Sequence, residues 1–103
     1  MDKYELYLIS LSECNACEEV KERLKNEEVK RKLKEKYGTS DVKIVYLDRV
    51  AESKEDSIAA HICYSLDSFS APKLVVKKRN RICELDERLE EVKCALLRKM
   101  PSS

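Results

Sequence analysis

The fold prediction depends most on the stretch Ser10-Leu11-Ser12-Glu13-Cys14-Asn15-Ala16-Cys17. Within this stretch, a strand pattern changes to a helix pattern. Tyr4 to Leu11 is rich in apolar and β-forming residues, which predicts a strand. From about Asn15, apolar residues recur at the three- and four-residue spacing of a helix. The residues of this apolar stripe are Cys17, Val20 and Leu24. The two cysteines are therefore expected where the first strand passes into the first helix.

The predicted helical region shifts its apolar stripe after Leu24, because the next apolar residue follows only after a gap of five. Asn26 either caps a second helical segment or marks a bend in one helix, and the sequence leaves both alternatives open. Gly38 stands where a left-handed C-terminal cap is expected. The second apolar stripe consists of Val29, Leu33 and Tyr37.

The middle of the chain predicts a strand, a helix and another strand. Asp41 to Asp48 is a nearly continuous apolar run, which is typical of a strand buried on both faces. Ser53 and Asp56 have the spacing of a capping box and predict that a helix begins there. Pro72 to Lys77 predicts the next buried strand. The apolar stripe of the predicted helix is Ile58, Ile62 and Leu66.

The last third of the chain predicts a hairpin followed by a helix. A polar turn, Lys78-Arg79-Asn80, precedes a short return strand over Ile82 to Leu85. Asp86 is suited to cap a last helix. The apolar stripe of that helix is expected to be Leu89, Val92, Leu96 and Met100.

These elements follow one another in the order β-α-β-α-β-β-α. Strand–helix–strand units require parallel pairing with a right-handed crossover, whereas the hairpin adds an antiparallel edge. The predicted fold class is therefore α/β, with a mixed sheet of about four strands. The chain has 103 residues and a mass of 12.0 kDa, which allows one domain over residues 1–103 and not two.

The charge balance argues against a nucleic-acid partner. The chain has 21 Lys and Arg residues against 20 Asp and Glu residues, for a formal net charge of +1. Binding to a phosphate backbone requires a surplus of positive charge. Aromatic residues make up 6% of the chain, with no Trp, so platforms for base stacking are few. The basic run Lys77-Lys78-Arg79-Asn80-Arg81 falls at the predicted hairpin tip, where cations keep a sheet edge soluble.

Composition also predicts the compartment. No apolar run approaches the roughly 18 residues of a membrane helix, and the first residues lack a secretory signal pattern. We therefore expect no membrane partner and a cytoplasmic protein. One Gly, two Pro and no Gln stand beside many Lys and Glu residues, which is a thermophile bias. Intracellular disulfides are found in such organisms.

The spacing of Cys14 and Cys17 favours thiol–disulfide chemistry. Two cysteines three residues apart at a helix start can close a disulfide with little distortion. Unpaired amides and the helix dipole favour a thiolate at Cys14, which makes Cys14 the nucleophile and Cys17 the resolving thiol. The carboxylates of Glu13, Glu18 and Glu19 oppose that thiolate, so a thiol of modest acidity and a reductant are expected.

Two other uses of the cysteines remain open, a zinc site and a purely structural role. A zinc site needs two further ligands, for which the chain offers His61, Cys63, Cys83 and Cys94. His61 and Cys63 lie two residues apart on a predicted helix and point in different directions, so no metal is expected. In a structural role, Cys63 is expected to be partly buried and Cys83 to face a packed side of the sheet. Cys94 is expected to face solvent on the last helix, and His61 to lie at the surface.

Four features of the chain together form a family pattern: Cys14, Cys17, the proline Pro72 before a strand, and the order of the elements. In these features the chain resembles the thioredoxin superfamily, and more narrowly the small glutaredoxin-like thioredoxins. The resemblance covers nearly the whole chain. It implies a thioredoxin-like sandwich and a thiol–disulfide oxidoreductase, or protein-disulfide reductase, whose redox-active disulfide needs no other cofactor. It also implies a cis peptide bond before Pro72 and contacts from Ala71 to an extended substrate. The expected partners are protein disulfides and an upstream reductase, with the chain acting as a monomer.

Two departures from the family pattern concern glutathione and the motif itself. Glutaredoxins usually carry a Gly-Gly pair after the last strand, entering a helix start that holds the glutathione carboxylate. The matching stretch, Cys83-Glu84-Leu85-Asp86-Glu87, has no glycine and three acidic residues, so a glutathione partner stays open. Asn15 and Ala16 match neither the Gly-Pro of thioredoxins nor the Pro-Tyr of glutaredoxins. The alternatives are a glutathione-coupled glutaredoxin and a binding module whose cysteines are structural.

Overall fold

The structure is a computed structural model that describes residues 3–101. The strands are β1 (Tyr4–Ser10), β2 (Val42–Tyr46), β3 (Lys73–Lys78), β4 (Arg81–Leu85) and β5 (Glu91–Leu96). The helices are α1 (Asn15–Leu24), α2 (Glu27–Tyr37), α3 (Ser57–Leu66) and the 3-10 helix η1 (Leu47–Arg49). Within residues 3–101, no helix has the length and apolar character needed to cross a bilayer.

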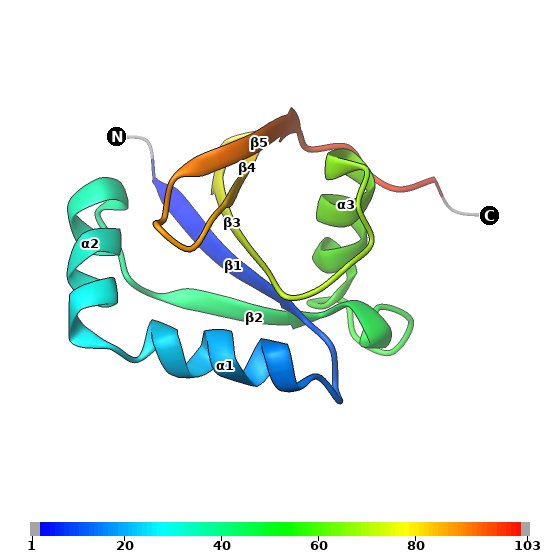
Figure 1. Ribbon diagram of the computed structural model, residues 1–103. Coiled ribbons are helices and arrows are strands. Elements are labelled where there is room, and N and C mark those ends of the chain that lie inside the picture. The colour runs from blue at the N-terminus through cyan, green and yellow to red at the C-terminus, as the bar shows by residue number, and fades with distance from the viewer. Residues whose placement is uncertain (1–2, 102–103) are drawn as a thin grey trace.

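The strands form one mixed sheet in the order β2-β1-β3-β4-β5 (Figure 1). β1 pairs with β2 in parallel, and the other neighbouring strands pair antiparallel. The expected α/β class, the mixed sheet and the β3–β4 hairpin are therefore confirmed. The expected strand number is wrong, because the described residues form five paired strands and not four.

Helices cover both faces of this sheet (Figure 1). On one face, Leu33 and Tyr37 of α2 pack on the strands, and Leu24 of α1 contacts the same core. On the other face, Ile62 and Leu66 of α3 form a second core. The strand residues of the first core are Leu6, Leu74, Val76, Cys83 and Leu85, and those of the second are Tyr7, Ile9, Val45, Val75 and Ile82. The alternation along each strand thus assigns neighbouring residues to opposite cores.

The first helical region is two helices and not one bent helix. Asn26 is the N-cap of α2, where its side chain accepts hydrogen bonds from the backbone N–H groups of Glu28 (2.8 Å) and Val29 (3.4 Å). Gly38 ends α2 in the left-handed region, with φ of 75°. An amide side chain that satisfies the free donors of a helix start stabilises a new helix at that point. The alternative in which Asn26 caps a second helical segment is therefore confirmed.

The expected last helix is wrong, because residues Glu91–Leu96 form strand β5. Asp86 does not cap a helix. Its carboxylate accepts the backbone N–H groups of Arg88 (2.8 Å) and Glu90 (3.0 Å) and so closes a turn. Val92 and Leu96 are 59% and 68% exposed and line no core. A spacing of four residues fits a helix stripe and one face of a strand equally well, and pairing with β4 decides between them.

Two further expectations, on the burial of β2 and on the start of α3, are wrong. β2 is an edge strand whose Ile44 is 42% exposed, so it is not buried on both faces. α3 begins at Ser57, and the capping box predicted from Ser53 is absent. Asp56 instead accepts the backbone N–H of Tyr46 at 2.8 Å, which ties the start of α3 to the end of β2.

Candidate functional site

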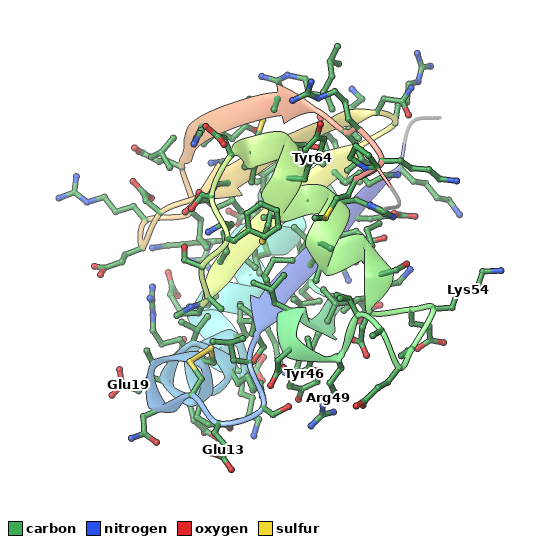
Figure 2. The ribbon with its side chains drawn as sticks, turned by 90° about the vertical axis from the view of Figure 1, so that its right-hand side faces the viewer. Glu13, Glu19, Tyr46, Arg49, Lys54 and Tyr64 are labelled. Atoms are coloured by element: carbon green, nitrogen blue, oxygen red, sulfur yellow. A yellow bond between two sulfur atoms is a disulfide. The ribbon has the colours of Figure 1, made fainter. Side chains whose placement is uncertain are left out.

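Cys14 and Cys17 form a disulfide at the start of α1, with their Cα atoms 5.2 Å apart. Cys14 is the N-cap residue of the helix, and its extended backbone places Sγ over the first turn. The backbone N–H of Cys17 donates to Cys14 Sγ at 3.1 Å. A donor at this distance stabilises a thiolate on Cys14. Figure 2 shows this disulfide as a yellow bond near the labelled residues Glu13 and Glu19.

The two sulfur atoms differ in burial. Cys17 is completely buried, whereas Cys14 is partly exposed. An external thiol or disulfide therefore reaches Cys14 and not Cys17. This asymmetry fits the roles expected for the pair, in which Cys14 attacks and Cys17 acts from within the protein.

The acidic surroundings of the motif are partly compensated by Lys21. Its ammonium donates to Glu18 Oε1 at 2.9 Å and to the Tyr46 hydroxyl at 3.2 Å. The hydrogen bond to Glu18 raises the pKa of Lys21, so the cation persists beside the helix start. Glu13 and Glu19 are exposed to solvent, which screens their effect on Cys14.

The segment before Cys14 is held by two residues from η1. The Asp48 carboxylate accepts the backbone N–H of Ser12 at 3.1 and 3.2 Å. Arg49 Nε donates to Ser12 Oγ at 2.9 Å, and its guanidinium lies 4.0 Å from the centre of the Tyr46 ring. Tyr46 and Arg49 are labelled side by side in Figure 2. Sequence reasoning missed these residues, because the contacts span 36 and 37 positions and no local motif marks them.

Asp48→Asn is expected to weaken this anchor in a pH-dependent way. Desolvation raises the Asp48 pKa, but hydrogen bonds from the Ser12 backbone and hydroxyl outweigh it and lower the pKa below 3.8. A lowered folded-state pKa contributes stability above the unfolded value, and that contribution is lost as the pH falls through the folded value. Urea unfolding should therefore show the variant less stable at pH 7, with the deficit shrinking as the pH falls through the lowered pKa of Asp48.

Asp41→Asn is the matched control, since Asp41 is an exposed carboxylate outside this cluster. Its stability should change little at either pH. An Asp48→Asn deficit that is the same at both pH values would contradict the anchor.

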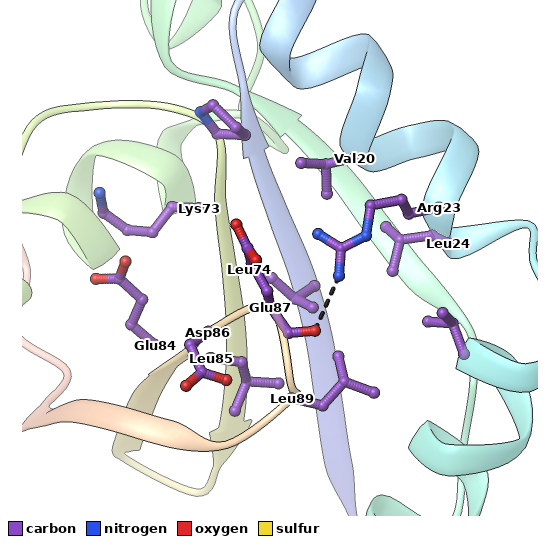
Figure 3. Close-up of a pocket in the computed structure, with 12 residues that line it drawn as sticks. Val20, Arg23, Leu24, Lys73, Leu74, Glu84, Leu85, Asp86, Glu87 and Leu89 are labelled. Carbon is purple, nitrogen blue, oxygen red and sulfur yellow. Dashed lines mark hydrogen bonds between the residues drawn. The ribbon is translucent and has the colours of Figure 1, made fainter.

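A groove of about 310 Å³ lies beside α1 (Figure 3). Val20 and Leu24 come from the helix face that also carries Cys17, so the groove starts one turn beyond the disulfide. Arg23 Nη2 donates to the carbonyl oxygen of Glu87 at 2.9 Å and bridges the groove, as the dashed line in Figure 3 shows. The other lining residues are Val29, Pro72, Lys73, Leu74, Glu84, Leu85, Asp86 and Leu89.

The Ala71–Pro72 peptide bond is cis, as the family resemblance implies. Pro72 lines the groove together with Val20, so the segment before β3 lies close to α1. Among residues 3–101, the backbone of Ala71 makes no hydrogen bond. Ala71 therefore has a peptide N–H and a C=O to offer to an extended chain.

Cys63 is a free thiol and fully buried, deeper than the partial burial expected. Burial raises the pKa of the thiol, and the Lys73 ammonium and the Ser70 backbone offset this effect in part. Lys73 is itself 3% exposed and donates to Ser70 Oγ at 2.9 Å and to the Ser70 carbonyl oxygen at 3.1 Å. A buried, protonated thiol is a poor nucleophile.

In the folded, oxidised protein, in which Cys63 is the one free cysteine, Cys63 is expected to resist alkylation. Mass spectrometry after incubation with iodoacetamide should find Cys63 unmodified at neutral pH and fully modified once guanidinium is added. Because the disulfide cysteines cannot react, the modification reports Cys63 alone. Equal rates with and without denaturant would show that the thiol is accessible and would contradict its burial.

The remaining cysteines form a second disulfide, Cys83–Cys94, between β4 and β5. Cys83 is buried and Cys94 exposed, as expected, but Cys94 is on a strand and has no free thiol. His61 is half-buried, and its Nδ1 accepts the backbone N–H of Met100 at 2.9 Å. Neither His61 nor Cys63 joins Cys14 and Cys17 in a potential metal cluster within residues 3–101.

Comparison of the chain with protein-family models, curated proteins and solved structures found no match.

Proposed function

We propose that this chain is a thiol–disulfide oxidoreductase that reduces disulfides of protein partners through Cys14 and Cys17. The observation that carries the proposal is the backbone N–H of Cys17 that donates to Cys14 Sγ at the start of α1, where Cys14 is partly exposed and Cys17 is buried. A purely structural disulfide does not need one sulfur at the surface in a position that stabilises a thiolate.

The proposed reaction has two exchange steps. The Cys14 thiolate attacks one sulfur of a substrate disulfide, which forms a mixed disulfide and releases the other substrate sulfur as a thiolate that takes up a proton. Cys17 loses its proton and attacks Cys14 Sγ, which releases the second substrate thiol and closes the Cys14–Cys17 disulfide. A dithiol reductase, the upstream partner in this proposal, then returns two electrons and two protons.

A protein substrate is favoured over glutathione by the groove. Glu84, Asp86 and Glu87 contribute three carboxylates, and Arg23 is already bonded to a backbone carbonyl. Glutathione carries two carboxylates and one amine, so its binding would bring like charges together. An extended chain instead pairs its backbone with Ala71. As part of the proposal, the protein is a distant thioredoxin-like relative that acts as a cytoplasmic monomer.

The proposal is tested by turnover. The chain, kept reduced by dithiothreitol, is mixed with a peptide disulfide carrying a fluorophore and a quencher. Catalytic release of fluorescence above the dithiothreitol background is expected, with little release when glutathione is the reductant. Glutathione-driven turnover would support the glutaredoxin alternative, and absence of turnover with either reductant would favour a binding module.

A further inference from the structure

A second cluster of reactive groups lies on β4 and β5, apart from α1. Cys83 and Cys94 are directly opposite in the antiparallel register. Glu91, three residues before Cys94, points its Oε1 to within 3.9 Å of Cys94 Sγ. The three potential ligand atoms lie within 4.8 Å of one another. Within residues 3–101, this is the one group of three or more Cys, His, Asp and Glu side chains that meets this criterion.

The surroundings of Glu91 are suited to a metal ligand. The Tyr37 hydroxyl donates to Oε2 at 3.3 Å, which leaves Oε1 directed at the cysteines. Tyr37 is 7% exposed and packs edge-on against Tyr4, so this donor is fixed in place. Hydrogen bonds of this kind orient carboxylates that bind metals. Arg81 Nη1 lies 3.7 Å from Oε1 and competes with a metal ion for this oxygen. Among the ion pairs of residues 3–101, this contact is the one that involves Glu91 and Arg81.

We propose that the reduced Cys83–Cys94 pair binds one thiophilic divalent cation such as Zn²⁺, with Glu91 as the third ligand and water as the fourth. Cys83 is buried, whereas Cys94 and Glu91 are exposed, so one side of the site is open to water. Two thiolates and a carboxylate are common zinc ligands.

One observed distance agrees with tetrahedral coordination. Sulfur atoms at about 2.3 Å from zinc lie about 3.8 Å apart, and a sulfur and a carboxylate oxygen lie about 3.6 Å apart. The observed 3.9 Å between Cys94 Sγ and Glu91 Oε1 is close to the second value. In the proposed reduced state, the two sulfur atoms separate to the first value by rotation of the cysteine side chains.

Disulfide and metal are therefore alternative states of one site. A dithiol reductant supplies two electrons and two protons, which convert the disulfide to two thiols. Zn²⁺ then displaces the two thiol protons and binds the thiolates. A disulfide oxidant, such as oxidised glutathione, takes up two electrons from the thiolates, closes the bond and releases the metal ion.

The test uses the full chain with Cys14→Ser and Cys17→Ser, so its outcome does not depend on the proposed oxidoreductase. The protein is reduced with a phosphine, freed of metal and titrated with Co²⁺, and thiolate-to-cobalt charge-transfer absorption is recorded. We expect a band that saturates at one Co²⁺ per chain and disappears when Zn²⁺ is added. The oxidised protein should show no band.

Three further variants assign the ligands. Cys94→Ser should abolish the band even though Cys63 and Cys83 remain. Glu91→Gln and Tyr37→Phe should each weaken Co²⁺ binding by about tenfold or more, while both cysteines are retained. Glu90→Gln, an exposed neighbouring carboxylate, is the control and should leave binding unchanged. A reduced protein that shows no band, or a band that survives Cys94→Ser, would overturn the proposal.

Discussion

Cys14→Ser is expected to abolish turnover of a peptide disulfide, with a loss of about a thousandfold or more, as for other catalytic nucleophiles. The hydroxyl that replaces Cys14 Sγ cannot form a mixed disulfide. Cys17→Ser should also stop turnover, but for a different reason. Its Cys14 thiolate still attacks, but the resolving thiol at position 17 is missing, so a stable adduct should accumulate and be visible by mass spectrometry.

The two serine variants together separate the proposed mechanism from its alternatives. Cys63→Ala is the matched control, because it removes a third cysteine that is buried in the core under α3. Its turnover should stay within a few-fold of the wild type. If Cys14→Ser retained most of the activity, or if Cys17→Ser formed no adduct, Cys14 would not be the nucleophile.

Leu33→Ala is expected to cost about 2–5 kcal/mol of unfolding free energy. Leu33 is fully buried in the core between α2 and the sheet, so truncation leaves a cavity there. For a domain of this size, such a loss is a large part of the total of about 5–15 kcal/mol. Urea denaturation followed by circular dichroism measures it directly.

Lys32→Ala is the control for this prediction, since Lys32 is exposed on the same helix. Its unfolding free energy should change by no more than about 0.5 kcal/mol. Equal effects of the two variants would show that α2 does not pack on the sheet through Leu33.

Local signals in the sequence were sufficient for much of this fold. Asn26 and Gly38 are residues whose side-chain and backbone chemistry favour helix ends, and both lie at the ends of α2. The spacing of Cys14 and Cys17 at the start of an amphipathic helix was likewise enough to predict where a disulfide can close. Such signals depend on neighbours within about four residues.

What could not be predicted depends on pairing between distant segments. Val92 and Leu96 are spaced for a helix, yet hydrogen bonding to β4 makes β5 a strand and joins Cys94 to Cys83. Asp48 fixes the segment before Cys14 across 36 positions. Neither contact can be recognised from the neighbouring sequence. A strand can pair with several other strands, and a carboxylate in a loop can accept hydrogen bonds from several other segments.

The equilibrium reduction potential of the Cys14–Cys17 pair tests the proposed function most directly. The full chain is equilibrated with dithiol buffers, and differential alkylation with mass spectrometry reports this pair separately from Cys83 and Cys94. We predict a potential between about −280 and −180 mV, the span of proteins that exchange disulfides. A value below about −300 mV, where structural disulfides lie, would contradict the account, as would a pair that does not oxidise.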